Sequence, residues 1–281
     1  MPTPATIIVD GKVLAQERLV KLAAAIQTLS RPPRLVVVLV GDDPASVKYV
    51  ERKRQTGASV GIVVLVHHLP QSTTTAEAQA VIAKIIQTDA VDGLIVQLPL
   101  PEHIDTVAVL NSVPAAVDVD CLTATNWYAL EQGNPLFIPP VAGAVLDIFD
   151  YYRIELTGME VVLVGYGRLV GQPLSLLLRQ RPVHVSVCTA GSADLAQVLP
   201  TADVIISGVG QPGLITGELV KAGAIVIDVG SSLVNGKLKG DVDFDSVAPK
   251  ARLITPTPGG VGPLTVVRLL ENVVQAAQNK V

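Results

Sequence analysis

The sequence is poor in cysteine, basic runs and metal-ligand spacings, and each shortage excludes a class of protein. Only two cysteines, Cys121 and Cys188, occur in 281 residues, and they form no Cys-x-x-Cys pair, so we expect reduced thiols rather than disulfides or a zinc site. The net charge is −4, and no basic cluster suggests a nucleic-acid partner. The four histidines show no ligand spacing, so we expect no metal.

Long apolar runs are also missing. No stretch reaches the roughly 18 residues of a membrane span. The N-terminus has neither the basic start nor the long apolar core of a signal peptide. We therefore expect a cytoplasmic protein with no membrane partner.

Small and branched apolar residues make up much of what is present. Apolar residues account for 49% of the chain and aromatic residues for 3%, as is typical of helices packed on a parallel sheet. Apolar runs at 34–41, 62–68 and 93–100 alternate with segments of helical spacing, which predicts an α/β fold. A second series, typical of a doubly wound nucleotide-binding sheet, lies at 160–171, 183–189, 202–210 and 224–230.

Two domains are expected. The first comprises residues 1–139 and the C-terminal helix 264–281, and the second is a Rossmann-type NAD(P)-binding domain of residues 140–263. The apolar residues of the last helix are spaced for a single face, so we expect this helix to pack back on the first domain.

The segment "GYGRLVG" (165–171) follows a predicted strand and precedes a predicted helix. Its glycines would let the backbone approach a pyrophosphate at the helix N-terminus, although the spacing is one residue longer than the usual fingerprint and a plain tight turn is the alternative. No acidic residue or arginine stands where the ribose is usually recognised, so the choice between NAD and NADP stays open. The predicted cofactor contacts are Gly165, Tyr166, Gly167, Arg168, Gly171, Ala190 and Ser231.

A helical stripe in the first domain carries Ser46, Tyr49 and Lys53, one turn apart. A lysine beside aromatic and apolar surface loses solvation, its pKa falls, and it can act as a general base; the alternative is an ordinary surface lysine. Gln97 ends a buried strand, where ligands of parallel sheets bind. The carboxylates of "DVDC" (118–121) either contact substrate or cap a turn.

Five ordered motifs together resemble the bifunctional methylenetetrahydrofolate dehydrogenase/cyclohydrolase family. They are "VGDDPASVKYVERKRQTGASVGI", "VDGLIVQLPLP", "DVDCLTATN", "GDVDF" and "TPTPGGVGPLT". The resemblance implies a homodimeric enzyme of one-carbon metabolism that serves purine, histidine and methionine biosynthesis. It would oxidise 5,10-methylenetetrahydrofolate with NAD(P)+ and hydrolyse the methenyl product to 10-formyltetrahydrofolate, in a folate cleft between the two domains.

The resemblance also implies residue roles. Lys53 would be the general base that activates water, and Gln97 would hydrogen-bond to it. Tyr49 would stack on the folate rings, and Asp120 would accept hydrogen bonds from the pterin. The other predicted substrate contacts are Ser46, Gly259 and Gly260.

Two alternatives remain open. Cyclohydrolase activity alone is the first, because the folate-side residues are present while Tyr166 and Gly167 stand where this family usually has the arginine and serine that hold a 2′-phosphate. A non-catalytic dinucleotide- or folate-binding module that regulates a partner is the second.

Overall fold

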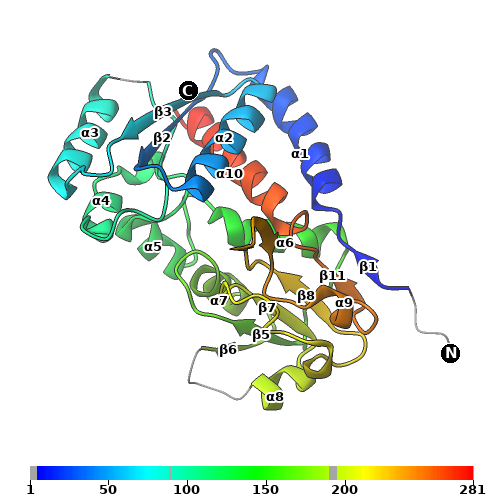
Figure 1. Ribbon diagram of the computed structural model, residues 1–281. Coiled ribbons are helices and arrows are strands. Elements are labelled where there is room, and N and C mark those ends of the chain that lie inside the picture. Colours follow the sequence, from blue (N-terminus) through cyan, green and yellow to red (C-terminus); the bar gives the residue numbers. More distant parts are fainter. Residues whose placement is uncertain (1–4, 89, 190–194, 281) are drawn as a thin grey trace. The chain divides into compact units, whose positions relative to one another are not determined.

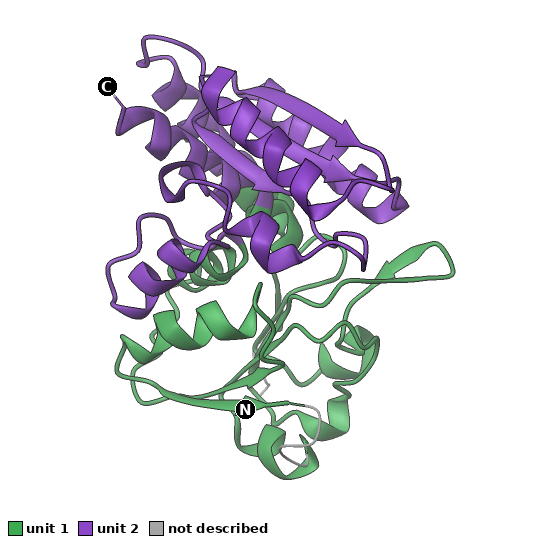
Figure 2. Ribbon diagram, turned by 90° about the vertical axis from the view of Figure 1, so that its left-hand side faces the viewer, with its two compact units in different colours: residues 1–15, 141–265 green, residues 16–140, 266–281 purple. Residues whose placement is uncertain are grey.

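The structure of the chain is a computed structural model that describes residues 5–88, 90–189 and 195–280. The chain divides into two compact units (Figure 2): unit 1 comprises residues 1–15 and 141–265, and unit 2 comprises residues 16–140 and 266–281. Each unit contains a parallel sheet with helices (Figure 1), and the predicted two-domain α/β fold is confirmed.

Unit 2 is built on a three-stranded sheet. Strand β2 (Arg34–Val40) lies in the middle and pairs in parallel with β3 (Val63–Leu69) and β4 (Gly93–Val96). Six of the seven β2 residues are buried, as an uninterrupted apolar run at a sheet centre requires. Helices α2 (Pro44–Ser59) and α3 (Thr75–Thr88) form the crossovers between these strands.

Shorter helices follow β4 in unit 2. They are α4 (Thr106–Leu110), the 3-10 turn η1 (Ala115–Val117) and α5 (Ala124–Glu131). Helix α1 (Gly11–Ile26) precedes β2, and α10 (Val261–Gln278) ends the chain.

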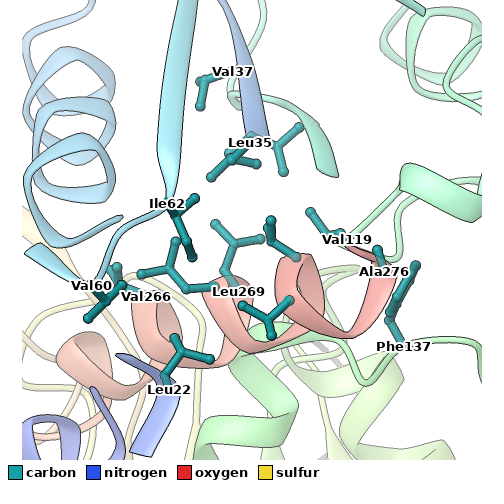
Figure 3. Close-up of a cluster of buried hydrophobic side chains, with 14 of the residues drawn as sticks. Leu22, Leu35, Val37, Val60, Ile62, Val119, Phe137, Val266, Leu269 and Ala276 are labelled. Carbon is teal, nitrogen blue, oxygen red and sulfur yellow. The ribbon is translucent and has the colours of Figure 1, made fainter. Parts of the chain in front are cut away.

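The C-terminal helix packs on the sheet of unit 2, as the sequence predicts. Leu269 and Val273 of α10 belong to the same buried cluster as Leu35 and Val37 of β2 (Figure 3). Leu22 of α1 lies in this cluster too. Each fully buried leucine of this kind contributes roughly 1.5–3 kcal/mol, so the last helix is a structural part of unit 2.

Unit 1 contains a six-stranded sheet in the order β1-β11-β8-β7-β5-β6, in which every pair is parallel. The strands are β1 (Ile7–Ile8), β5 (Glu160–Val164), β6 (His184–Cys188), β7 (Val204–Ser207), β8 (Ile225–Asp228) and β11 (Leu253–Ile254). The helices are α6 (Pro140–Tyr151), α7 (Gly171–Arg179), α8 (Leu195–Val198) and α9 (Phe244–Val247), with 3-10 turns η2 (Leu199–Thr201) and η3 (Gly217–Leu219).

Two features of unit 1 were not anticipated by the sequence. The expected boundaries, 1–139 and 140–263, do not foresee β1, which pairs with β11 of unit 1. A small antiparallel hairpin joins β9 (Ser232–Val234) to β10 (Lys237–Lys239). Its turn residues, Asn235 and Gly236, both have positive φ, as a type I′ hairpin turn requires.

The chain order of the sheet creates a switch point in unit 1. From β5 the chain moves to β6 on one side and then to β7 on the other side. Ligands of doubly wound sheets bind beyond the carboxyl ends of the strands at such a reversal. The residues that follow β5 and β7, Gly165 and Gly208, therefore mark the expected nucleotide site.

Candidate functional site

Helix α2 presents the predicted stripe of Ser46, Tyr49 and Lys53. The side chain of Asp43 caps the helix by accepting a 2.8 Å hydrogen bond from the Ser46 N–H, and proline occupies the first turn. Ser46 is buried, whereas 40% of Tyr49 is exposed. Further along, Gly57 brings the helix against the sheet, since an added Cβ would lie 2.6 Å from a methyl group of Val64.

Lys53 and Gln97 are joined directly. The Nζ atom of Lys53 donates a 2.9 Å hydrogen bond to Oε1 of Gln97. The amide of Gln97 is oriented by a second bond, in which its Nε2 donates to the carbonyl oxygen of Leu98 at 2.7 Å. Oε1 is therefore the atom that faces the lysine, and Gln97 is itself buried.

The loop "DVDC" is fixed by its first two residues. Asp118 is buried, and its carboxylate accepts hydrogen bonds from the N–H groups of Leu122 and Thr123 and from the Asn126 side chain. Val119 is fully buried in the cluster around α10. Asp118 is thus a loop-forming residue, which is the alternative that the sequence left open for it.

Asp120 lies near Lys53, and each affects the other's ionisation. Burial lowers the pKa of Lys53, and the charge of Asp120 opposes this by raising it. Burial raises the pKa of Asp120, which the charge of Lys53 lowers and that of Asp118 raises. Burial therefore favours the neutral form of both groups, and a neutral amine retains a lone pair that can accept a proton.

Asn272 of α10 also supports this loop, and sequence reasoning missed it. Its buried side chain donates from Nδ2 to the carbonyl oxygens of Val119 and Ile138, both at 2.9 Å. An asparagine inside the apolar face of the last helix was the available signal, because a buried amide needs hydrogen-bond partners.

The glycine turn of unit 1 is tightly packed. Gly165 has a φ of 99°, a conformation that favours glycine, and an added Cβ would lie 2.6 Å from the Val209 side chain. A Cβ on Gly171 would lie 2.0 Å from the Gly165 carbonyl oxygen. Gly167 has open space around its Cα. The turn therefore leaves backbone accessible at Gly167 while its ends are fixed.

Helix α7 begins directly after this turn without a side-chain cap at Val170. The positive end of a helix dipole suits a pyrophosphate, and the switch point of the sheet lies here, so these residues fit a dinucleotide. Tyr166 is exposed and Arg168 is half-buried. Ser231 is exposed just after β8, and Ala190 lies outside the described residues.

The predicted substrate glycines, Gly259 and Gly260, lie in unit 1 beside the start of α1. The Gly11 N–H donates to the Gly259 carbonyl oxygen at 3.0 Å, and a Cβ on Gly11 would lie 1.7 Å from the Gly260 carbonyl oxygen. Position 11 must therefore be glycine, because the backbone of Gly259 and Gly260 packs directly against it.

Within residues 5–88, 90–189 and 195–280, no group of three or more His, Cys, Asp or Glu side chains is placed to hold a metal ion. No helix in these ranges combines the length and apolar character needed to cross a membrane.

Two family models match the sequence. Residues 9–120 match the tetrahydrofolate dehydrogenase/cyclohydrolase catalytic domain, and residues 139–281 match the NAD(P)-binding domain of the same family.

Individual proteins match over nearly the whole chain. The sequence is 44% identical to the bifunctional protein FolD of Nautilia profundicola, over 97% of each chain. The structure resembles that of the bifunctional enzyme FolD from Campylobacter jejuni, with a TM-score of 0.95, 38% identity, and 99% of this chain and 100% of that one covered. It also resembles the Trypanosoma brucei methylenetetrahydrofolate dehydrogenase-cyclohydrolase, complexed with NADP cofactor and inhibitor, with a TM-score of 0.94, 33% identity and 99% of each chain covered.

Proposed function

This chain belongs to the tetrahydrofolate dehydrogenase/cyclohydrolase family, and we propose that it oxidises 5,10-methylenetetrahydrofolate with NAD(P)+ and then hydrolyses the methenyl product to 10-formyltetrahydrofolate. The predicted family, the enzyme class and the NAD(P)-binding domain are confirmed by the family models and by the bifunctional relatives. The roles of individual residues are our proposal.

The contact between Lys53 and Gln97 carries the proposal for the folate side. A lysine that donates to an amide oxygen while burial lowers its pKa gives up its proton more readily than an exposed lysine does. A neutral amine does not repel the methenyl cation, whereas an ammonium would. Tyr49, exposed one turn earlier on α2, offers a ring face for the folate, and Ser46 lies one turn before that.

Hydrolysis then follows from general-base catalysis. Water attacks the methenyl carbon, and Lys53 Nζ accepts the proton that the water loses, while Gln97 Oε1 keeps the amine aimed. The hydroxyl group of this adduct then loses its proton as the carbonyl forms, the carbon–nitrogen bond to N5 breaks, and N5 takes up a proton, which leaves the formyl group on N10. Asp120 would accept hydrogen bonds from the pterin and orient it. Gly259 and Gly260 would form a loop over the substrate.

On the oxidation side, the dinucleotide supplies the hydride acceptor. Gly165, Gly167 and Gly171 would hold its pyrophosphate at the start of α7. Tyr166, Arg168 and Ser231 would border the ribose and phosphate groups, and Ala190 is proposed from the sequence alone.

An assay with 5,10-methylenetetrahydrofolate and either NADP or NAD tests this function. The absorbance of the methenyl compound measures how much product forms. Both dinucleotides bind at the same turn, and we expect turnover with at least one of them. No methenyl formed with either dinucleotide, while added methenyl compound is still hydrolysed, would leave the cyclohydrolase as the sole activity.

We also propose a homodimer formed through the open edge of β3. Of the strands that the structure describes, β3 pairs with β2 alone, and Val63 and Val66 are exposed on it. Its sequence, "VVLVHHL", contains no lysine or proline to block an edge. Sedimentation of the wild type and of Val66→Lys tests this, since the substitution should shift the protein toward monomer. The cytoplasmic location stays a prediction from the sequence, and the three biosynthetic pathways stay predictions of the resemblance.

A further inference from the structure

Among the buried carboxylates of unit 1 that the proposed chemistry does not use, Asp228 and Asp241 lie close together. Asp228 is the last residue of β8, and Asp241 lies in "GDVDF" after the β9–β10 hairpin. Asp228 is 3% exposed and Asp241 is fully buried. Buried carboxylates are costly unless hydrogen bonds stabilise them, so their partners indicate what they hold in place.

Asp241 holds the loop that follows β7. Its Oδ2 accepts hydrogen bonds from the Ser207 hydroxyl and from the Val209 N–H, both at 2.8 Å. Its Oδ1 accepts from the Gln211 N–H at 2.8 Å. Three donors from residues 207–211 therefore converge on a single carboxylate, which fixes the path of this loop.

Asp228 holds the loop after β8 and the segment that carries Asp241. Its Oδ1 accepts from the N–H groups of Gly230 at 2.9 Å and of Asp241 at 3.1 Å, and its Oδ2 accepts from the Val242 N–H at 3.1 Å. The backbone of Asp228 donates to the Thr255 hydroxyl at 2.7 Å. The two carboxylates are thus linked, because Asp228 positions the backbone of Asp241.

The glycines of these segments fit the same arrangement. A Cβ on Gly230 would lie 2.2 Å from the carboxyl carbon of Asp241, and a Cβ on Gly240 would lie 1.8 Å from Oδ2 of Asp228. Each carboxylate therefore occupies the space that a side chain on the other segment would need, and both segments must carry glycine there.

The loop held by Asp241 packs against the dinucleotide turn. Gly165 approaches Val209 so closely that an added Cβ would lie 2.6 Å from its side chain, and a Cβ on Gly208 would lie 2.8 Å from the Val170 side chain. Gly165 and Gly208 follow β5 and β7, the strands that flank the switch point. Loss of the Asp241 contacts would therefore release one wall of the expected nucleotide crevice.

We propose that Asp228 and Asp241 are positioning residues for dinucleotide binding, which set the loops 208–211 and 229–231 at the switch point of unit 1. The inference rests on the proposed function, because it assumes that the dinucleotide binds at this turn. It adds two residues that would act through backbone and not through contact with the cofactor. Ser231, the predicted cofactor contact, directly follows the Gly230 N–H that Asp228 binds.

Ionisation provides an independent readout of this role. The pKa of Asp228 is raised to about 6: burial and the charge of Asp241 raise it, and the N–H groups of Val242, Asp241 and Gly230 partly offset this. In the described structure Asp241 is the charged group that acts on it. Since only the carboxylate accepts all three N–H bonds, dinucleotide affinity should fall as the pH drops through about 6.

Calorimetric titration of the intact protein with NADP and with NAD tests the proposal. We expect Asp241→Asn and Asp228→Asn to raise the dinucleotide Kd at least about tenfold. In each variant an amide NH₂ group replaces one carboxylate oxygen, so that two donors face each other where the wild type has a hydrogen bond. Asp245→Asn, an exposed neighbour in α9, removes the same charge and should leave Kd unchanged. Asp228→Asn should also abolish the decline in affinity near pH 6.

Hydrolysis of added methenyl compound, measured without dinucleotide, separates positioning from general damage. Lys53, Gln97 and Asp120 belong to unit 2, so this rate should change less than about twofold in the variants. If either aspartate variant fails to fold, Ser207→Ala removes one donor to Asp241, and we expect it to raise Kd about threefold.

The outcomes are distinct. Unchanged Kd in folded aspartate variants, or a parallel loss of hydrolysis, would overturn the positioning role while the proposed function stands. A wild-type protein that binds neither dinucleotide would overturn the proposed oxidation, and the positioning role with it.

Discussion

Lys53 Nζ lies 2.9 Å from Gln97 Oε1, although 44 residues separate the two in sequence. Helix α2 supplies the amine, and the carboxyl end of β4 supplies the amide. The parallel pairing of β2 with β4 extends to the Gln97 N–H, which donates to the Val38 carbonyl oxygen at 2.9 Å. The crossover helix α2 and the end of strand β4 therefore bring together the two groups on which the proposed hydrolysis depends.

The pH dependence of hydrolysis should respond to Asp120. The base form of Lys53 is active, so the rate should rise with pH through the ionisation of Lys53, at a pKa that burial lowers. Asp120 raises this pKa, and Asp120→Asn should therefore move the rising limb to lower pH. A pH–rate profile of methenyl hydrolysis measures the shift.

Glu102→Gln, an exposed surface change, is the control and should leave the limb in place. If the rising limb of the pH–rate profile is unchanged or moves to higher pH in Asp120→Asn, the charge of Asp120 does not act on Lys53 as proposed.

Cys121 should tolerate glycine better than alanine. Its φ is 59°, a left-handed conformation that costs a residue with a Cβ roughly 1–2 kcal/mol, and its thiol donates to the Phe137 carbonyl oxygen at 3.3 Å. Both substitutions lose the buried thiol, but only glycine relieves the backbone. We expect Cys121→Gly to be about 1 kcal/mol more stable than Cys121→Ala in urea unfolding.

Cys188 provides the opposite control, because it lies at the end of β6 outside the positive-φ residues. Here alanine should be the more stable of the two substitutions, by about 1 kcal/mol. The same order at both cysteines would contradict the conformational explanation.

Asp92 should stabilise unit 2 in a pH-dependent manner. It is fully buried, and Arg31 donates two hydrogen bonds of 2.7 Å to its two oxygens. Burial raises the pKa of Asp92, but Arg31 and the Arg34 N–H outweigh this and lower it below the ordinary 3.8. The stabilisation is therefore present above pH 3.8 and is lost as the pH falls through the lowered pKa.

Asp92→Asn should cost about 2 kcal/mol of unfolding free energy at pH 7 and much less at pH 3, as measured by urea unfolding. Glu51→Gln, which breaks an exposed pair with Arg54, should have no measurable effect at either pH. An equal cost for Asp92→Asn at both pH values would contradict the assigned ionisation.

Much of the fold could be predicted because the signals are local. Apolar runs at 34–41 and 62–68 became β2 and β3, and the stripe of Ser46, Tyr49 and Lys53 lies on α2 as its spacing requires. Strands of two residues carry no such signal, and β1 and β11 were missed because their partners are far apart in sequence.

The site was predicted less completely, for the same physical reason. Residue patterns alone left the roles of Asp118 and Asp120 open, and only the resemblance gave Asp120 a substrate role. The loop-forming role of Asp118 depends on its contacts with the N–H groups of Leu122 and Thr123, which a pattern does not show. The link between Asp228 and Asp241 has no local pattern, and the position of Asn272 in an apolar helix face does not reveal its partners, since each contact joins segments that only the fold brings together.

The rate of methenyl hydrolysis by Lys53→Met tests the central claim most directly. Loss of the general base should lower this rate by about 100-fold or more, while the free energy of unfolding changes little. Lys48→Met, an exposed lysine on the same helix, should retain the wild-type rate. A folded Lys53→Met enzyme that hydrolyses the methenyl compound at the wild-type rate would show that the amine next to Gln97 is not the base.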